Sequence, residues 1–253
     1  MNGTFKKING AGPELYHFPA LESLGFKTFV SGRGGGVSPE PFHSLNTNYS
    51  GGDSEENVRE NMSRIKSALK IERLWAPSQV HGDDVAIIEQ DAPAGITEAD
   101  AVIISSPSLA VGVRTADCLP LIIADPVKRA AAAIHAGRRS TELHITAKTI
   151  KIMAEKFGSD PADMSVALGP CIRNCCYHVD KETAARFHAC CGGGGGQYLD
   201  IVEANIRQLL ESGVRQTAIV DSGICSSCDN LRFYSYRKDG NVTGRFISGV
   251  ALA

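Results

Sequence analysis

Long hydrophobic runs are absent from this sequence of 253 residues. The longest dense apolar stretch, Leu119 to Ala124, has six residues, whereas a membrane-spanning helix needs about 20. The sequence opens with Met1-Asn-Gly-Thr-Phe-Lys-Lys and has no apolar segment behind this basic flank, so no secretory signal is visible. We therefore predict no association with a membrane.

An excess of charge of either sign is absent as well. The chain has 26 Lys and Arg residues against 28 Asp and Glu residues, which gives a formal charge of −2. A general nucleic-acid-binding protein would need a basic surface to displace counterions from phosphates, so we expect no nucleic-acid partner. Hydrophobic residues make up 43% and charged residues 21% of the chain, which is the composition of a folded globular protein.

Cysteine is plentiful, but the context of a disulfide-stabilised protein is missing. Eight cysteines would suit a short secreted chain, whereas this chain is long and has no export signal. We therefore predict reduced thiols and a cytoplasmic location. Cys225 and Cys228 have the spacing of half a zinc knuckle, and residues 171–178 contain candidates for the other half. Adjacent cysteines are unlike the tidy ligand pairs of structural zinc sites, so small packed thiols are the favoured interpretation.

Apolar residues recur with helical periodicity in four segments. The first opens with Asp53-Ser-Glu-Glu, a capping-box pattern, and continues to Leu69 with apolar residues three or four positions apart. Gly158 follows the end of another segment and is a typical helix stop. The predicted helices cover residues 53–69, 141–157, 180–189 and 200–212.

Short apolar segments rich in β-branched residues predict strands. Several of them follow one another without a helix, notably between residues 101 and 135, so strict alternation of strand and helix fails. The sequence therefore predicts an α+β fold, a single domain over residues 1–253 with mixed β-sheet layers and flanking helices. The predicted strands cover residues 26–31, 85–88, 101–104, 109–114, 119–124, 130–134, 165–168, 217–220 and 245–250.

Three short motifs place metal-competent side chains next to small residues at the ends of predicted strands. They are Gln79-Val-His81-Gly82, Ala116-Asp-Cys118 and His135-Ala-Gly137. Two histidines and one thiolate suit zinc and leave a fourth position for water or substrate. Copper accepts the same set, although a blue-copper site also takes a weak axial ligand such as methionine, and no motif here offers one.

Spacing alone does not bring these three residues together. The separations of 37 and 17 residues match no local zinc-binding pattern. A second interpretation needs no metal, because Cys118 would serve as the nucleophile of a cysteine hydrolase with His135 or His81 as its base. Both interpretations require only that the thiolate and an imidazole converge.

A set of motifs covers nearly the whole chain, and in this order it resembles the laccase-domain family of YfiH-like proteins. The motifs are Gly32-Arg-Gly-Gly-Gly-Val-Ser38, Ser44-Leu-Asn46, Gly52-Asp53, Val58-Arg-Glu-Asn61, Gln79-Val-His81-Gly82, Ala99-Asp-Ala101, Thr115-Ala-Asp-Cys-Leu-Pro120, His135-Ala-Gly137, Leu168-Gly-Pro170, Phe233-Tyr-Ser-Tyr-Arg237 and Thr243-Gly-Arg245.

The resemblance implies an α+β single domain with a zinc site formed by His81, Cys118 and His135, copper being the alternative metal. Members of the family were first described as polyphenol oxidases or laccases. They are now described as purine nucleoside enzymes that phosphorolyse adenosine, inosine and methylthioadenosine and that also deaminate adenosine. The expected partners are therefore a purine nucleoside and inorganic phosphate.

Five further residues are candidates for roles at this site. Asp117 is a candidate catalytic residue, which would transfer protons or orient a ligand histidine. Arg33 and Arg237 are candidates for orienting phosphate and balancing its charge. Asn46 and Gln79 are candidates for hydrogen bonds to the substrate, or for fixing turns.

The chain departs from the family pattern at one place. The family usually continues His-Ala-Gly with Trp-Arg-Gly, whereas this chain reads Arg138-Arg139-Ser140. A flat apolar ring is thus replaced by a guanidinium, which can stack on a base or bind phosphate. We therefore expect the metal ligands to be kept and the substrate preference to differ.

Three functional classes follow from these observations. The leading prediction is a zinc-dependent purine nucleoside phosphorylase with adenosine deaminase activity. A copper-dependent polyphenol oxidase would bind copper and consume oxygen with a phenol. A metal-free cysteine hydrolase would survive chelation and be abolished by thiol alkylation. A non-catalytic interaction module is not expected, because reactive groups gather in three separate motifs.

Overall fold

The computed structural model describes residues 4–10, 12–91, 95, 97–107, 109–192 and 195–253. These residues form two six-stranded sheets. The first has the order β1 (Lys6–Lys7), β2 (Leu15–His17), β3 (Phe26–Ser31), β12 (Phe246–Leu252), β7 (Ala110–Thr115), β4 (Leu74–Trp75). The second has the order β11 (Ile219–Asp221), β10 (Ser165–Leu168), β8 (Leu119–Asp125), β9 (Ala130–Ala136), β6 (Ala101–Ile104), β5 (Val85–Ile88).

Both sheets are mixed, which confirms the predicted fold class. The pairs β4–β7, β5–β6 and β10–β11 are parallel, and the remaining pairs are antiparallel. The helices of the described residues are α1 (Pro19–Glu22), α2 (Glu55–Leu69), α3 (Arg138–Glu142), α4 (Ile145–Phe157), α5 (Lys181–Cys191), α6 (Ile201–Glu211) and α7 (Tyr236–Asp239). None of them combines the length and the apolar content needed to cross a membrane.

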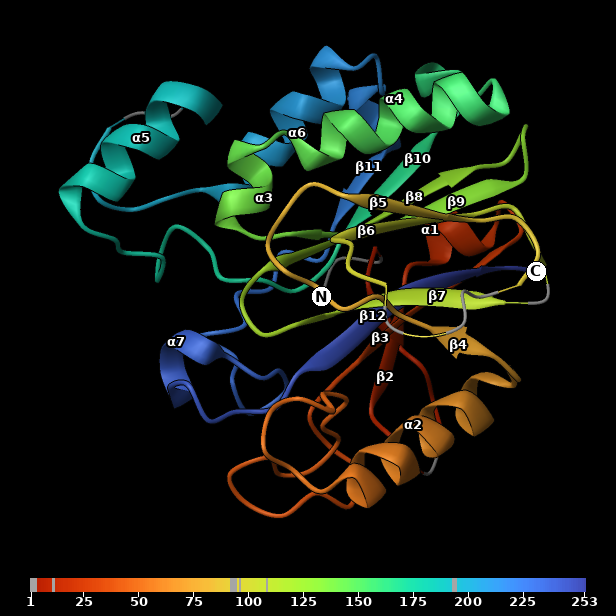
Figure 1. Cartoon of the computed structure of the whole chain (residues 1–253), viewed down its shortest axis with the longest axis vertical. Coiled ribbons are helices and arrows are strands. Elements are labelled where there is room, and N and C mark those ends of the chain that lie inside the picture. The colour runs from red at the N-terminus through yellow and green to blue at the C-terminus, as the bar shows by residue number, and fades with distance from the viewer. Residues whose placement is uncertain (1–3, 11, 92–94, 96, 108, 193–194) are drawn as a thin grey trace.

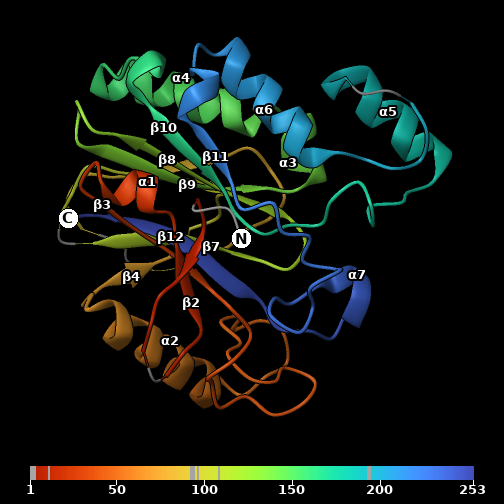
Figure 2. The same ribbon diagram turned by 180° about the vertical axis from the view of Figure 1, so that it is seen from behind.

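The sheets pack against each other, and helices cover their outer faces (Figures 1 and 2). The alternation of side chains along each strand explains this layering. In β6, Val102 joins the cluster between the sheets, whereas Ile103 joins the cluster under α4 and α6. On the other side, Ile65 of α2 packs onto the first sheet. One domain with four layers results, and its apolar core lies on both faces of each sheet.

Helix α2 forms where the sequence predicts it. The Ser54 hydroxyl accepts a hydrogen bond from the backbone N–H of Asn57 at 3.1 Å and so caps the first turn, an interaction that contributes about 1 kcal/mol. Val58, Ile65 and Leu69 are buried against the first sheet. The helix ends where Lys70 adopts a left-handed conformation with φ of 53°.

The predicted helix over residues 141–157 is wrong at its start. Residue 141 belongs to the short helix α3, and α4 begins only at Ile145. His144 stands between them in a left-handed conformation with φ of 59°, which an α-helix cannot contain. The predicted strand over 217–220 begins two residues late, at Ile219, because a 3₁₀ turn occupies Gln216–Ala218. The short strands β1, β2 and β4 lack any clear alternation and were not predicted.

Two connections carry the chain from the first sheet to the second and position the residues of the site: that from β4 to β5 contains His81, and that from β7 to β8 contains Cys118. Strand β7 ends at Thr115, and β8 of the other sheet begins at Leu119. Strand β9 runs antiparallel to β8, so that Leu119 is paired with Ala136 and Pro120 with His135. This register brings the start of β8 next to the end of β9. The predicted Cys118 and His135 therefore meet at one end of the sandwich.

Candidate active site

His81, Cys118 and His135 converge as the sequence motifs predicted. Their possible ligand atoms all lie within 4.8 Å of one another, and the Cys118 Sγ lies 3.8 Å from His81 Nε2. The two imidazole rings stand edge to face, with their centroids 4.8 Å apart. A tetrahedral zinc ion with usual bond lengths would separate sulfur and nitrogen by about 3.6 Å. The three side chains are therefore arranged as one ligand group.

The turn before Cys118 is held in an unusual backbone conformation. Asp117 has φ of 87°, which a residue with a side chain rarely adopts. Its buried carboxylate accepts hydrogen bonds from the Ser226 hydroxyl at 2.7 Å and from the backbone N–H of Arg237 at 2.6 Å. Its backbone carbonyl accepts another from the N–H of Ile172. Asp117 thus links the turn that carries Cys118 to the loops of Ile172 and Ser226 and to α7, which contains Arg237.

Asp100 is the carboxylate that contacts a ligand histidine. Its fully buried side chain lies 2.7 Å from Nδ1 of His135, which leaves Nε2 of that ring for the ligand group. The same carboxylate accepts backbone N–H bonds from Val80, His81 and Gly82 at 2.7–3.2 Å. Asp100 therefore shapes the loop of one histidine and orients the other. The sequence singled out Asp117 for this orienting role, although Asp100 stands in the quoted motif Ala99-Asp-Ala101.

The ionisation of this group follows from its contacts. Burial raises the pKa of the Cys118 thiol, but His135 and His81 lower it by more, to about 6. Burial lowers the pKa of His135, but the Cys118 thiolate and Asp100 raise it to about 9. The pair is therefore a thiolate and an imidazolium at neutral pH when no metal is bound.

Space for an ion is provided at Gly137. A Cβ atom at this position would lie 3.0 Å from Cys118 Sγ and 3.1 Å from His81 Cδ2. Only a glycine leaves the centre of the ligand group open at this approach. The residues therefore fit a metal ion, and a thiolate with two imidazoles is the donor set of a catalytic zinc site with one open position.

The ligand group opens into a cavity of about 940 Å³. Four arginines, Arg114, Arg138, Arg237 and Arg245, line it, whereas Asp117 is the only carboxylate among its described lining residues. Such a wall favours an anionic or phosphate-bearing ligand. The other lining residues are Asn48, Tyr49, Ser50, Trp75, Ala76, Pro77, Ser78, Gln79, His81, Gly95, Thr97, Thr115, Ala116, Cys118, His135, Ile172, Tyr177, Ile201 and Tyr236.

Three of the four arginines, Arg114, Arg237 and Arg245, have no carboxylate partner for the side chain among the described residues, whereas Arg138 pairs with Glu142. Arg114 donates from Nε to the carbonyl of Thr47 at 2.8 Å, and Arg245 donates to the carbonyls of Thr243 and Gly244 at 2.9 Å. Burial lowers the pKa of both guanidinium groups, and the Cys118 thiolate and Asp117 raise that of Arg245 in part. Half-buried cations without a counter-ion are the feature expected of an anion site.

The sequence predicted four substrate-binding residues, and the structure places two of them on the cavity wall. Arg237 lines it and donates to the carbonyls of Cys176 and His178 at 3.2 and 2.7 Å. Gln79 lines it as well, but its amide oxygen accepts from the Arg114 N–H and its amide nitrogen donates to the Arg114 carbonyl, both at 2.8 Å. Gln79 thus fixes the backbone of a cavity arginine.

The other two predicted residues do not line the cavity. Asn46 is fully buried, and its side-chain oxygen accepts a hydrogen bond from the backbone N–H of Arg245 at 2.9 Å. Arg33 forms an ion pair with Asp239 at 3.0 Å and so holds α7, the helix that carries Arg237. Both side chains are therefore placed to hold segments that carry cavity arginines.

The three residues that depart from the family pattern, 138–140, lie in different surroundings. Arg138 opens α3, lines the cavity and pairs with Glu142 at 2.7 Å. Arg139 is exposed and does not line the cavity. Ser140 is buried, and its hydroxyl has no hydrogen-bond partner among the described residues. Of the three changes, that at Arg138 is therefore the one placed to alter the cavity.

The Asp100→Asn variant tests the orienting role of the Asp100 carboxylate. The change keeps the shape of the side chain but replaces one acceptor oxygen by an N–H₂ group, which would face backbone donors or His135. We expect the affinity for zinc to fall about 10- to 100-fold, as is usual when the partner of a ligand histidine is lost. Competition with a chelating dye measures this affinity. An unchanged affinity would show that His135 needs no partner.

The pH dependence of metal binding follows from the two perturbed pKa values. Between pH 6 and pH 9 the imidazolium of His135 must lose its proton before it binds a metal, whereas Cys118 is already a thiolate. We expect about one proton to be released per zinc bound at pH 7.5, and a second below pH 6, so that affinity falls more steeply in acid. Calorimetry in buffers of different ionisation enthalpy measures this number. No proton release at pH 7.5 would contradict the assigned imidazolium.

The chain is similar to known proteins in both sequence and structure. A family model described as multi-copper polyphenol oxidoreductase laccase matches residues 27–253. A purine nucleoside phosphorylase of Streptomyces coelicolor is 36% identical over 231 residues, which cover 87% of this chain and 93% of the relative. A purine nucleoside phosphorylase of Deinococcus radiodurans is 36% identical over 229 residues, 87% of each chain. The crystal structure of YlmD from Geobacillus stearothermophilus has a TM-score of 0.90 at 28% identity and covers 98% of both chains.

Proposed function

This chain belongs to the multi-copper polyphenol oxidoreductase laccase family, and we propose that it is a zinc-dependent purine nucleoside phosphorylase that also deaminates adenosine. The observation that most directly supports this proposal is the cavity, in which a His–Cys–His ligand group and guanidinium groups without carboxylate partners among the described residues lie together. Relatives that are 36% identical are named purine nucleoside phosphorylases. The proposed substrates are adenosine, inosine and methylthioadenosine, together with inorganic phosphate.

His81, Cys118 and His135 would hold the zinc ion, which supplies a Lewis acid at the floor of the cavity. Zinc is preferred to blue copper because the cavity offers no axial methionine. Met62, Met153 and Met164 do not line it, and Met1 lies outside the described residues. Asp100 keeps the His135 ring oriented, and the Asp117 turn holds Cys118 in place.

Arg114 and Arg245 are the proposed phosphate-binding residues. Both reach the cavity with guanidinium N–H groups that the backbone acceptors leave free, and neither has a carboxylate partner among the described residues. Guanidinium groups bind phosphate oxygens through paired hydrogen bonds. Arg245 and Cys118 line the same cavity, and the thiolate raises the pKa of the Arg245 guanidinium, so phosphate bound to Arg245 would share the cavity with the ligand group.

The nucleoside would fill the rest of the cavity. A volume of about 940 Å³ suits a ligand of this size. Tyr177 and Trp75 provide flat faces for a purine, and Arg138 provides a guanidinium plane in place of the tryptophan usual in the family. Nucleoside choice would therefore depend on Arg138.

In phosphorolysis, a phosphate oxygen forms a bond to the anomeric carbon of the ribose while the bond from that carbon to the purine breaks. The electron pair of the broken bond goes to the purine, which takes up the proton that the phosphate loses as it becomes the ribose phosphate ester. Positive charge develops on the ribose and negative charge on the purine. The guanidinium groups orient the phosphate for attack, and their fixed positions need little reorganisation during the reaction.

Incubation of the purified protein with adenosine, with and without phosphate, tests this function. Adenine and ribose 1-phosphate that form only with phosphate would establish phosphorolysis, and inosine that forms without phosphate would establish deamination. Chelation should abolish both activities if the metal is required. Oxygen consumption with a phenol and bound copper would instead favour the oxidase, and activity that survives chelation but not alkylation would favour the cysteine hydrolase.

Reduced thiols are a condition of this function, because the thiolate is the form of cysteine that binds a metal. The cytoplasm keeps thiols reduced, and it is the location that we propose. Neither a nucleic acid nor a membrane is among the proposed partners.

A further inference from the structure

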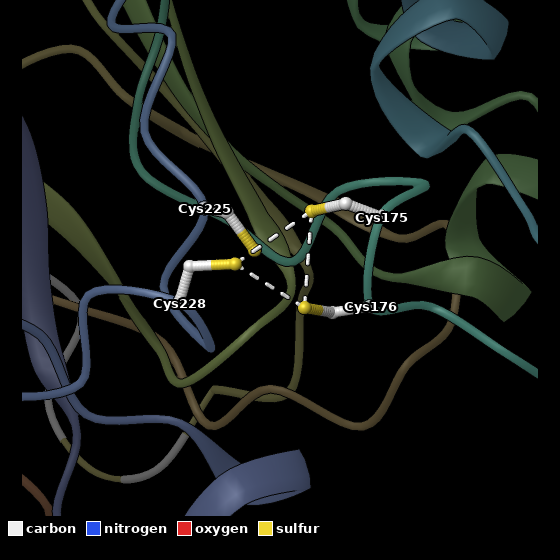
Figure 3. Close-up of side chains that lie close together, drawn as sticks. All are labelled: Cys175, Cys176, Cys225 and Cys228. Atoms are coloured by element: carbon white, nitrogen blue, oxygen red, sulfur yellow. Dashed lines mark hydrogen bonds between the residues drawn. The ribbon is translucent and has the colours of Figure 1, made fainter.

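Four cysteines outside the active site gather at one point of the surface (Figure 3). Cys175 and Cys176 come from the loop after β10, and Cys225 and Cys228 come from the loop after β11. Their sulfur atoms all lie within 4.8 Å of one another. The Sγ of Cys228 lies 3.4 Å from that of Cys176 and 3.8 Å from that of Cys175. The favoured interpretation of the sequence, separate packed thiols, does not describe this arrangement.

These distances fit a single tetrahedral metal ion. Two sulfurs bound to one zinc at usual lengths lie about 3.8 Å apart. An iron–sulfur cluster divides its four thiolates among two or four iron atoms, so that all four do not surround one point at these distances. All four thiols are free, so no disulfide accounts for their approach. A group of four thiolates around one point is the donor set of a structural zinc site.

Packing does not explain the group either. Cys175 and Cys228 are exposed, and Cys176 and Cys225 are half-buried. Cysteines that serve as small apolar residues are normally buried, as Cys171 is here. Cys171 lies next to the group in sequence and is not part of it.

The two loops are braced by contacts that do not involve the four sulfurs. Cys171 and Cys225 form a parallel β-bridge, with a hydrogen bond of 2.9 Å from the Ser226 N–H to the Cys171 carbonyl. Arg173 donates to Asp221 at 2.8 Å. These contacts hold the two loops together independently of the sulfur atoms, which reduces the ordering that metal binding requires.

The same loops support the wall of the active site. Ser226, between Cys225 and Cys228, donates its hydroxyl to Asp117, whose neighbour is Cys118. Tyr177 follows Cys176 directly and lines the cavity. An ion that joined the two loops would fix both of these contacts, although it would not touch the substrate.

We propose that Cys175, Cys176, Cys225 and Cys228 bind a second, structural zinc ion, separate from the His81–Cys118–His135 group. This ion joins the two loops, one of which contacts Asp117 through Ser226 while the other carries Tyr177 of the cavity lining. The proposal does not depend on which reaction the active site performs, because it rests on the thiols and their loops alone.

Metal analysis of four proteins purified under reducing conditions tests the proposal. We expect about two zinc ions per chain in the wild type, about one in Cys228→Ser and about one in Cys118→Ala. Cys190→Ser, which removes an exposed thiol outside the group, should retain both ions. Replacing zinc by Co²⁺ should give the visible spectrum of a four-thiolate site in Cys118→Ala and lose it in Cys228→Ser.

A thiol titration of the native wild type covers the case in which Cys228→Ser does not fold. Bound metal should protect Cys175 and Cys228 although they are exposed, and a chelator should make them reactive. Freely reactive thiols, or no loss of metal in Cys228→Ser, would overturn the proposal. So would a disulfide within the group in the reduced preparation. One equivalent of iron in place of zinc would overturn the choice of metal. A wild type that binds both ions but lacks phosphorylase activity would contradict the proposed function alone.

Discussion

The Cys118→Ala protein is expected to lose its active-site zinc and to fall in turnover by on the order of 10³-fold, the upper end of what loss of one charge-stabilising group costs. Alanine removes the only thiolate of the ligand group, and two imidazoles alone hold zinc weakly. The loss should appear in kcat, because it removes the group that acts on the reacting atoms. Metal analysis and the rate of adenine formation measure the two effects.

The fold should survive this change. Cys118 is only half-buried, and among the described residues its thiol contacts only the two histidines by hydrogen bonding, so that alanine leaves a small space at the cavity surface. Circular dichroism should be unchanged, and Cys190→Ser serves as a matched control that removes a thiol elsewhere. A Cys118→Ala protein with wild-type turnover would contradict both the zinc site and the cysteine hydrolase.

The main elements of the fold could be predicted because each has a local signal. Strands β3, β5, β6 and β10 have the predicted bounds, since their apolar runs end at turn residues. The helix signals at Ser54 and Gly158 lie at the predicted ends, since capping is local chemistry. The break at His144 was not predictable, because the apolar periodicity continues through it and tertiary packing imposes the left-handed residue.

The metal-binding residues of the active site could be predicted from the sequence, whereas the arginines that line its cavity were predicted less well. Family membership confirms the resemblance that the motifs indicated. Cys118 and His135 meet because β8 pairs with β9, and His81 joins them from the loop before β5, whose backbone donates to Asp100. The motifs could indicate this convergence and the spacing could not. Arg114 was missed, since an arginine at the end of an apolar strand resembles an ordinary exposed residue in sequence. That its charge is half-buried and lacks a carboxylate partner is a property of the folded chain only.

Asn46, Gln79 and Arg33 illustrate a further limit of motif reasoning. Polar residues within a motif can be recognised as important, but their contacts are not encoded in the spacing. In the structure Asn46 binds the backbone of Arg245, Gln79 binds the backbone of Arg114, and Arg33 holds the helix of Arg237. We infer that these three side chains position the arginines for phosphate. The motif residues would therefore act one contact away from the substrate.

Arg245→Met is expected to raise the KM for phosphate and to lower kcat/KM for phosphorolysis by about 10²- to 10³-fold. Methionine keeps most of the apolar stem but removes a cation that lies near Cys118 and Asp117. It also removes two hydrogen bonds to the carbonyls of Thr243 and Gly244. The effect should be much smaller on the KM for adenosine, because the residues proposed to face the purine are Tyr177, Trp75 and Arg138.

Two matched variants separate this effect from a general loss of charge or of structure. Arg139→Met removes an exposed arginine outside the cavity and should leave both KM values unchanged. Arg245→Lys keeps the charge but not the planar fork, and should recover part of the affinity for phosphate. Steady-state kinetics with phosphate and adenosine varied in turn measure the two constants. An equal rise in both KM values for Arg245→Met would show that the residue supports the cavity as a whole and does not bind phosphate.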